Sequence, residues 1–200
     1  MSRRAAPLLL SVFLALTASG AADAAGRELV LPAGEVVEKG EVLEIEPGSR
    51  VFLEGTLEVK GTLRIEGTEA SPVTIEMKNE KGYGVAIRGG ALDAEYFSIS
   101  GAGRGIESYS GKVRMARGKV RLPGIHISAA GGTDLDLREM EFAGGKAGVV
   151  IRSGSKGVVT GCRFAGQEKA GVYVYGTAGV RITGAIFSGA GTGVILTLPG

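Results

Sequence analysis

Several residue types that form cross-links or functional sites are scarce in this 200-residue sequence, which contains one cysteine, one histidine and no tryptophan. The single cysteine, Cys162, excludes an intramolecular disulfide. The fold must therefore be held together by its core and its backbone hydrogen bonds. A buried thiol usually serves as a small apolar group, and we expect that role for Cys162.

Aspartate is also scarce, because beyond residue 24 only Asp93, Asp134 and Asp136 occur. Calcium sites need clustered carboxylates, and only Asp134 and Asp136 share a predicted strand face, close to two glutamates. Pairing with Lys156 or Arg138 on a solvated face is the commoner role of such carboxylates. We therefore predict no metal site and no cofactor.

Glycine is abundant, at 35 of the 200 residues, whereas proline occurs only six times. The glycines follow no Gly-X-Y period, which excludes collagen. Val, Ile and Leu are too frequent for a disordered chain. Abundant glycine together with many β-branched residues predicts short strands separated by tight turns.

The first 24 residues resemble a secretory signal. Arg3 and Arg4 form a basic start, residues 5–18 are apolar, and residues 22–24 (Ala-Asp-Ala) form a small-x-small cleavage site. An apolar run of about 14 residues is too short to span a bilayer comfortably, and we predict no transmembrane segment. We expect residues 1–24 to be a signal peptide, residues 25–200 to form one domain, and the protein to be exported to the periplasm, cell surface or extracellular medium.

Charge is divided unevenly along the chain. Residues 25–80 carry 12 acidic and 6 basic side chains, whereas residues 81–200 carry 8 acidic and 15 basic ones. The basic excess is greatest in one patch, formed by Lys112, Arg114, Arg117, Lys119 and Arg121. This patch suits an acidic polysaccharide, a lipid head group or the acidic half of another copy. Nucleic acid is not an expected partner of an exported protein.

The segment GTLEVKGTLRIEGTE, residues 55–69, repeats a six-residue phrase. Apolar and polar residues alternate within each phrase, which predicts short strands with one dry side and one wet side. Further on, glycines followed by alternating apolar residues recur at steps of 21, 19, 24, 23 and 22 residues: Gly84, Gly105, Gly124, Gly148, Gly171 and Gly193. A period of about 22 residues indicates a solenoid with three short strands and a loop in each coil.

A second landmark keeps phase with these glycines. An apolar or aromatic residue precedes them by six or seven positions at Ile99, Phe142, Phe164 and Phe187, whereas the coil of residues 112–123 has no such residue. The alternation predicts a set of inward-facing side chains: Val149, Ile151, Cys162, Phe164, Val172, Val174, Val194 and either Ile186 or Phe187. It places Tyr175 outside.

The phrases GVVTGCRFAGQEKAGVYVYG and GVRITGAIFSGAGTGVILTLPG resemble the right-handed parallel β-helix repeat family, a pectate-lyase-like superfamily of exported solenoids. The resemblance covers about residues 28–200, and the stretch at residues 43–75 is similar to the first coils of many exported members. It implies an all-β fold, a single right-handed parallel β-helix of about eight coils. A left-handed β-helix would keep six-residue phasing throughout, and a β-sandwich would not hold a 22-residue register. Many members carry asparagine ladders at their turns, but here Asn79 is the only asparagine.

The strand after each repeating glycine carries the residues most typical of a site. Counted from the glycines, its outward side chains form two columns, in which Glu107, Tyr109 and His126 would lie on adjacent coils. Base, acid and carboxylate-neutralising groups of these types serve polysaccharide lyases, so these three are the catalytic candidates. Four further residues on the same sheet are candidates for binding a ligand: Arg88, Arg152, Tyr173 and Tyr175.

Family resemblance is weak evidence for function, because members include lyases, epimerases, adhesins and periplasmic maturation factors. The chain is short and has no long insertion that could build the wall of a catalytic groove. These features favour a non-enzymatic surface or periplasmic module that binds polysaccharide or another copy of itself. A small carbohydrate-active enzyme of the lyase or epimerase type is the alternative.

The last eight residues, 193–200, are among the most apolar in the chain. Solenoids usually end in a polar cap, and Pro199 blocks only one backbone position. We therefore expect either that the natural chain continues or that another copy covers this coil in a head-to-tail homo-oligomer.

Overall fold

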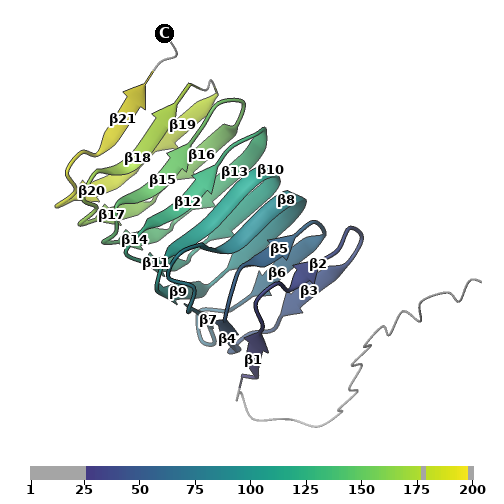
Figure 1. Ribbon diagram of the computed structural model, residues 1–200. Helices are drawn as coiled ribbons and strands as arrows, with labels where there is room; N and C mark the ends of the chain where they lie inside the picture. The colour runs from purple at the N-terminus through teal and green to yellow at the C-terminus, as the bar shows by residue number, and fades with distance from the viewer. Residues whose placement is uncertain (1–25, 177–178, 198–200) are drawn as a thin grey trace, which may run out of the picture.

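The computed structural model describes residues 26–176 and 179–197. Every pair of neighbouring strands runs parallel, and the chain winds as a β-solenoid with three faces (Figure 1). The first face is an eight-stranded sheet, which gives eight coils. The predicted all-β parallel solenoid of about eight coils is therefore confirmed. The predicted signal peptide, residues 1–24, lies outside the described residues.

Each face is a ladder of strands from successive coils. The first face contains β1 (Glu28–Leu31), β4 (Arg50–Leu53), β7 (Val73–Met77), β9 (Phe97–Gly101), β11 (Lys119–Arg121), β14 (Glu141–Ala143), β17 (Arg163–Ala165) and β20 (Ile186–Ser188). The second face contains β2 (Val36–Val37), β5 (Leu57–Val59), β8 (Tyr83–Glu95), β10 (Arg104–Ala116), β12 (Ile125–Ala129), β15 (Ala147–Ile151), β18 (Ala170–Tyr175) and β21 (Val194–Thr197). The third face contains β3 (Val42–Ile45), β6 (Thr62–Glu66), the distal halves of β8 and β10, β13 (Thr133–Arg138), β16 (Lys156–Thr160) and β19 (Val180–Thr183).

The six-residue repeat near residue 55 becomes one strand per face. In the second coil β5 and β6 follow each other directly, with Gly61 at the corner between them. In the next two coils the corner is continuous, so β8 and β10 each bend from the second face onto the third. Later coils insert turns between the same two faces. The strand register already steps by 22 residues between the first two coils, where Leu31 pairs with Leu53 and Val37 with Val59.

The core is a continuous apolar column inside the coils. Of the side chains predicted to face inward, Val149, Ile151, Cys162, Phe164, Val172 and Val174 are buried, and Phe187 and Val194 are partly buried against the core. Phe187 takes the inner position and Ile186 the exposed one, while Tyr175 is 49% exposed, as expected. Burial raises the pKa of the Cys162 thiol, since a thiolate would lose its hydration there.

The coil that interrupts the repeat is explained by a shift of register. Ile127 pairs with Ile106 on one side and Val149 on the other, so His126, and not Gly124, lies between Gly105 and Gly148. The register then steps by 21, 21, 22, 23 and 22 residues. Val120 pairs with both Ile99 and Phe142, which supplies the landmark that was missing from this coil.

Two of the repeating glycines, Gly148 and Gly171, are required by the core and not by a turn. A Cβ atom on Gly148 would lie 2.6 Å from the ring of Phe164, and one on Gly171 would lie 2.5 Å from the ring of Phe187. Neither glycine has a positive φ angle. Glycine is therefore needed where the ring of the following coil leans over the backbone.

His126 occupies this glycine position with a ring of its own. Its imidazole lies 5.8 Å from the ring of Phe142, centroid to centroid, and begins a stack that continues through Phe164 and Phe187 at 4.9 and 5.0 Å. Its coil has the smaller Val120 where the next coil has Phe142. This coil therefore has Val120 and His126 where the next coil has Phe142 and Gly148, and each of the two coils contributes one ring to the stack.

Within residues 26–176 and 179–197 the secondary structure consists of strands, and no helix there could cross a membrane.

Candidate functional site

Among the hollows on the outside of the described part of the solenoid, two differ clearly in charge. One, which we call the tyrosine groove, is formed by the C-terminal coils of the second face and measures about 720 Å³. Its lining comprises Ile125, Ala130, Lys146, Ala147, Val150, Arg152, Ser153, Lys169, Ala170, Tyr173, Tyr175 and Ile195. This size falls within the usual range of ligand pockets.

The strand register places the tyrosines in the groove. Tyr173 pairs with Val150 on one side and Ile195 on the other, and Tyr175 pairs with Thr197. The two tyrosine rings are 6.5 Å apart and inclined at 54°. The Tyr173 hydroxyl lies 3.2 Å from the Thr197 hydroxyl, within hydrogen-bonding distance. The groove thus has an apolar floor and two aromatic side chains with polar tips.

The cations of the tyrosine groove have no acidic partners among the described residues. Lys146, Arg152 and Lys169 line it without an aspartate or glutamate, and none of the three forms an ion pair within residues 26–176 and 179–197. Ala147 pairs with Ala170, so Lys146 and Lys169 project from matching positions on adjacent coils, about 4.8 Å apart along the solenoid. The groove can therefore attract an anion.

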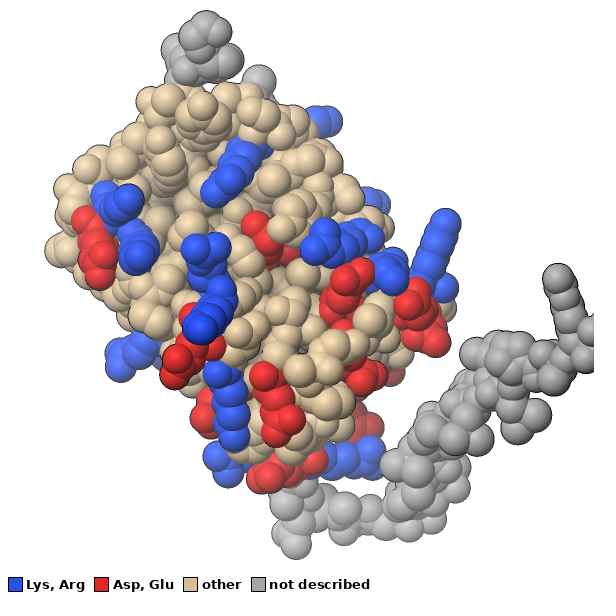
Figure 2. Space-filling view, in the orientation of Figure 1, with Lys and Arg blue, Asp and Glu red and all other residues tan. Residues whose placement is uncertain are grey.

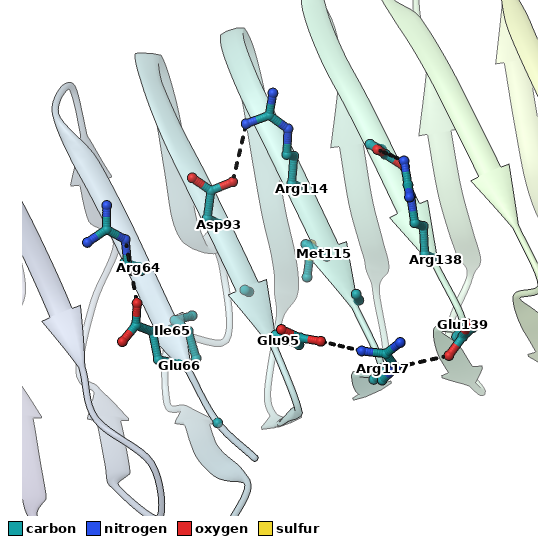
Figure 3. A pocket seen from close by; sticks show the side chains of 14 residues that line it. Arg64, Ile65, Glu66, Asp93, Glu95, Arg114, Met115, Arg117, Arg138 and Glu139 are labelled. Carbon is teal, nitrogen blue, oxygen red and sulfur yellow. Dashed lines mark hydrogen bonds and ion pairs between the residues drawn. The ribbon is translucent and has the colours of Figure 1, made fainter. Parts of the chain in front are cut away.

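The second hollow, which we call the charged groove, lies over the third face and the corner that follows it (Figure 3). It is lined by four arginines and five carboxylates: Arg64, Arg114, Arg117, Arg138, Glu66, Asp93, Glu95, Asp136 and Glu139. The strand register places opposite charges side by side. Asp93 pairs with Arg64 and with Arg114, and Arg114 pairs with Asp136. Positive and negative side chains therefore alternate from coil to coil.

Each arginine of the charged groove already has a carboxylate partner. Arg114 lies 3.6 Å from Asp93, and Arg117 bridges Glu95 and Glu139 (Figure 3). Arg138 donates two hydrogen bonds to Asp136, of 3.0 and 2.8 Å. These contacts raise the pKa values of Arg117 and Arg138, chiefly through the hydrogen bonds that the two guanidinium groups donate to Glu139 and Asp136. The expected pairing of Asp136 with Arg138 is confirmed, and the groove is largely neutralised.

The predicted basic patch is interleaved with acids from neighbouring coils. Arg114 and Arg117 belong to the charged groove, and Lys119 lies 3.3 Å from Glu141. Lys112 pairs in register with Asp134, and Arg121 with Ala143. The sequence places five cations close together, but the fold inserts carboxylates between them, so they do not form an isolated basic surface.

The three catalytic candidates do not share one surface. His126 was expected to face outward beside Glu107, and this is wrong, since Ser128 pairs with Glu107 and His126 is fully buried. The error follows from counting the register from Gly124. Ser128 therefore takes the position beside Glu107 that was expected for His126. Burial lowers the pKa of His126, whose Nε2 lies 3.0 Å from the Leu122 carbonyl.

Tyr109 and Glu107 do lie close together on β10, where the pairing with β8 is irregular. Hydrogen bonding to Glu107 raises the pKa of the Tyr109 phenol, and burial and the charge of Glu107 act in the same direction. A phenol with a raised pKa stays protonated at neutral pH, which does not suit a base.

Of the four binding candidates, Arg152, Tyr173 and Tyr175 meet in the tyrosine groove. Arg88 does not join them, because it lies over the Tyr109 ring at 4.4 Å and 3.5 Å from Glu58. Lys146 and Lys169 were missed as candidates. Their signal in the sequence is a lysine just before the strand in each of two successive coils, at Lys146-Ala147-Gly148 and Lys169-Ala170-Gly171.

Comparison with known proteins bears on the fold. A family model described as the right-handed β-helix region matches residues 123–198, which include the tyrosine groove. Searches of curated proteins and of solved structures gave no match. The matched region and the parallel solenoid that contains it support the predicted likeness to the right-handed β-helix repeat family.

Proposed function

We propose that the protein is an exported, non-enzymatic module whose tyrosine groove binds an acidic polysaccharide. The observation that carries the proposal is the combination, around one hollow, of two tyrosines and three cations that have no acidic partner in the described part of the chain. The charged groove is the internal contrast, since its arginines are bound to carboxylates of the same chain.

Each part of the groove suits a uronic-acid sugar. The amphipathic rings of Tyr173 and Tyr175 suit the apolar faces of sugar rings, and their hydroxyls can hydrogen-bond to sugar hydroxyls. Arg152 can hold a carboxylate by two parallel hydrogen bonds. The lysines at matching positions on adjacent coils favour a ligand with repeated negative charge.

Export to the periplasm, cell surface or extracellular medium is part of the proposal. Its support is the basic start, the apolar stretch and the small-x-small site within residues 1–24. An extracellular or periplasmic position would give the groove access to polysaccharides. Retention of the chain inside the cell during fractionation would contradict this part.

A glycan array with acidic and neutral members tests the binding. We expect the protein to retain uronic-acid glycans and not neutral ones, and the double variant Tyr173→Ala/Tyr175→Ala to bind at least tenfold more weakly. Tyr109→Ala is the matched control, because Tyr109 is exposed to a similar extent as Tyr175 but lies outside the tyrosine groove. Equal retention of neutral glycans, or unchanged binding by the double variant, would overturn the proposal.

The same polymers distinguish the alternative, a small carbohydrate-active enzyme of the lyase or epimerase type. Lyases generate unsaturated products that absorb ultraviolet light, and epimerases alter the sugar without cleaving it. We expect neither an absorbance increase nor a change in the recovered sugars. Sustained product formation would establish the enzyme and remove the non-enzymatic part of the proposal.

A further inference from the structure

The cations of the tyrosine groove stand at its two edges and not at its centre. β15 runs from Ala147 to Ile151, so Lys146 comes just before this strand and Arg152 just after it. With a rise of about 3.3 Å per residue, their Cα atoms lie about 20 Å apart. On the next coil the strand register places Lys169 beside Lys146 and Tyr175 beside Arg152. Cations at this separation suit two anionic groups on one extended ligand better than one compact anion.

The centre of the groove, between these edges, is apolar and aromatic. Val150 belongs to the outward column of β15, yet it is only 5% exposed. Tyr173 pairs with it from the next coil and is half-buried, and its amphipathic ring suits the apolar face of a sugar. A ligand that reaches from one edge of the groove to the other along β15 and β18 would therefore pass over an apolar floor.

The direction along the solenoid axis offers a polyanion much less. Toward the N-terminal coils the outward column continues from Val150 to Glu107, two coils away, whose carboxylate would repel it. Arg88, a cation on that side, is already 3.5 Å from Glu58. On the other side the column continues to Ile195, which is apolar. In Figure 2 red and blue side chains crowd the lower, N-terminal coils, while the upper end of the visible face is mostly tan.

We propose that the tyrosine groove holds its ligand across the solenoid, along β15 and β18, as a segment of about four uronic-acid sugars. Lys146 and Lys169, at positions about 4.8 Å apart, bind the carboxylate at one end of the segment. Arg152 binds the carboxylate at the other end by two parallel hydrogen bonds. Tyr173 contacts the sugar rings between them.

The length of the segment follows from the distance between the two edges. One sugar unit of an extended chain is about as long as the spacing between coils, about 5 Å, so about four units span about 20 Å. This orientation rests on the proposed function and adds the length and direction of the bound segment.

Calorimetric titration with uronic-acid oligosaccharides, from disaccharide to octasaccharide, tests the length. We expect the affinity to rise at least tenfold from disaccharide to tetrasaccharide, because the second carboxylate then binds within the same complex. From tetrasaccharide to octasaccharide it should rise by no more than about fivefold, since the longer chain only offers more positions for the same segment. A disaccharide that binds as tightly as the tetrasaccharide, or a larger gain beyond the tetrasaccharide, would overturn the length.

Two charge variants show whether both edges are used. Arg152→Gln should remove the gain, so that it binds the tetrasaccharide no more than about twofold more tightly than the disaccharide. Arg114→Gln lowers the net charge equally but lies in the charged groove, and it should keep the gain. An unchanged gain in Arg152→Gln would overturn the two-edged contact.

A spin label at the reducing end of the tetrasaccharide tests the direction. The label broadens nearby amide resonances of isotope-labelled protein, and we expect the strongest broadening at one end of β15, near Lys146 or near Arg152. Strongest broadening near Glu107 or Ile195 would place the ligand along the axis and overturn the direction. Absence of binding by every oligosaccharide and by the polymer would overturn the proposed function as well, whereas the other contrary results overturn only the orientation.

Discussion

At the scale of single residues, His126 shows how an inner position can hold a side chain that the sequence pattern places outside. The imidazole is fully buried, its Nε2 faces the Leu122 carbonyl, and its Nδ1 has no hydrogen-bond partner among the described residues. Desolvation therefore lowers its pKa below the ordinary value of about 6.5. The folded protein holds His126 neutral where an unfolded chain would begin to protonate it.

This burial predicts that acid destabilises the fold through His126. The folded-state pKa is below the unfolded one, so the contribution is fully present above pH of about 6.5 and is lost as pH falls through the folded-state pKa. Urea unfolding at pH 8 and pH 5 should show a larger loss of stability for wild type than for His126→Phe, which has no titratable ring. The comparison cancels groups common to both proteins. Equal losses in the two proteins would contradict the assigned role of the imidazole.

A second residue-scale prediction concerns the register of the last coils. Phe164 is fully buried between two stacked rings, and its replacement by alanine should cost about 3–5 kcal/mol of unfolding free energy. Tyr175 is half exposed, and Tyr175→Ala should cost less than about 1 kcal/mol. Chemical denaturation measures both. A larger cost for Tyr175→Ala would mean that the strand is displaced by one residue.

At the scale of structural elements, the ring stack is maintained by pairs of positions. The coil of β14 has Phe142 with Gly148, whereas the preceding coil has Val120 with His126. The repeat therefore conserves the content of a layer and not the residue at each position. A position that is glycine in one coil can hold a ring in another, as at His126, whose own coil has the smaller Val120 in place of a phenylalanine.

This pairing predicts a compensating double substitution. His126→Gly should leave a cavity beside Phe142 and cost about 3 kcal/mol, as for other buried rings. Val120→Phe alone should overpack the same layer and cost about 1–3 kcal/mol. Together they recreate the phenylalanine–glycine layer of the next coil. The double variant should therefore be more stable than the sum of the two single costs predicts, by a coupling of about 1–3 kcal/mol. Additive costs in a double-mutant cycle would show that the two positions are independent.

The sequence predicted the elements better than their exact alignment. Alternation and the 22-residue period identified the parallel solenoid and the inner columns around Phe164, because those signals repeat in many coils. The glycine count failed at Gly124 because this coil differs at both landmark positions. It has Val120 where the next coil has phenylalanine, and His126 where the next coil has glycine. Pairing between coils was also hidden, because partners such as Arg117 and Glu139 are 22 residues apart. For that reason the basic run looked unpaired in the sequence.

At the scale of the whole molecule, the two grooves divide the charged side chains by role. In the charged groove the carboxylates and arginines of successive coils neutralise one another, and exposed pairs of this kind add little stability individually. In the tyrosine groove the cations lack such partners among the described residues, and aromatic side chains lie beside them. Under the proposed function, this division confines ligand binding to the tyrosine groove and leaves the charged groove without a ligand.

Calorimetric titration of a uronic-acid polymer into matched charge variants tests whether binding belongs to the tyrosine groove. Arg152→Gln/Lys169→Gln removes two unpaired cations of the tyrosine groove, whereas Arg114→Gln/Arg138→Gln removes two paired cations of the charged groove. Both change the net charge by the same amount. We predict that the first pair of substitutions weakens binding at least tenfold, or about 1.4 kcal/mol, and makes the salt dependence shallower. For the second pair we predict an affinity within about twofold of wild type. Equal weakening by both pairs would show that binding follows net charge alone and would contradict the assignment of the site.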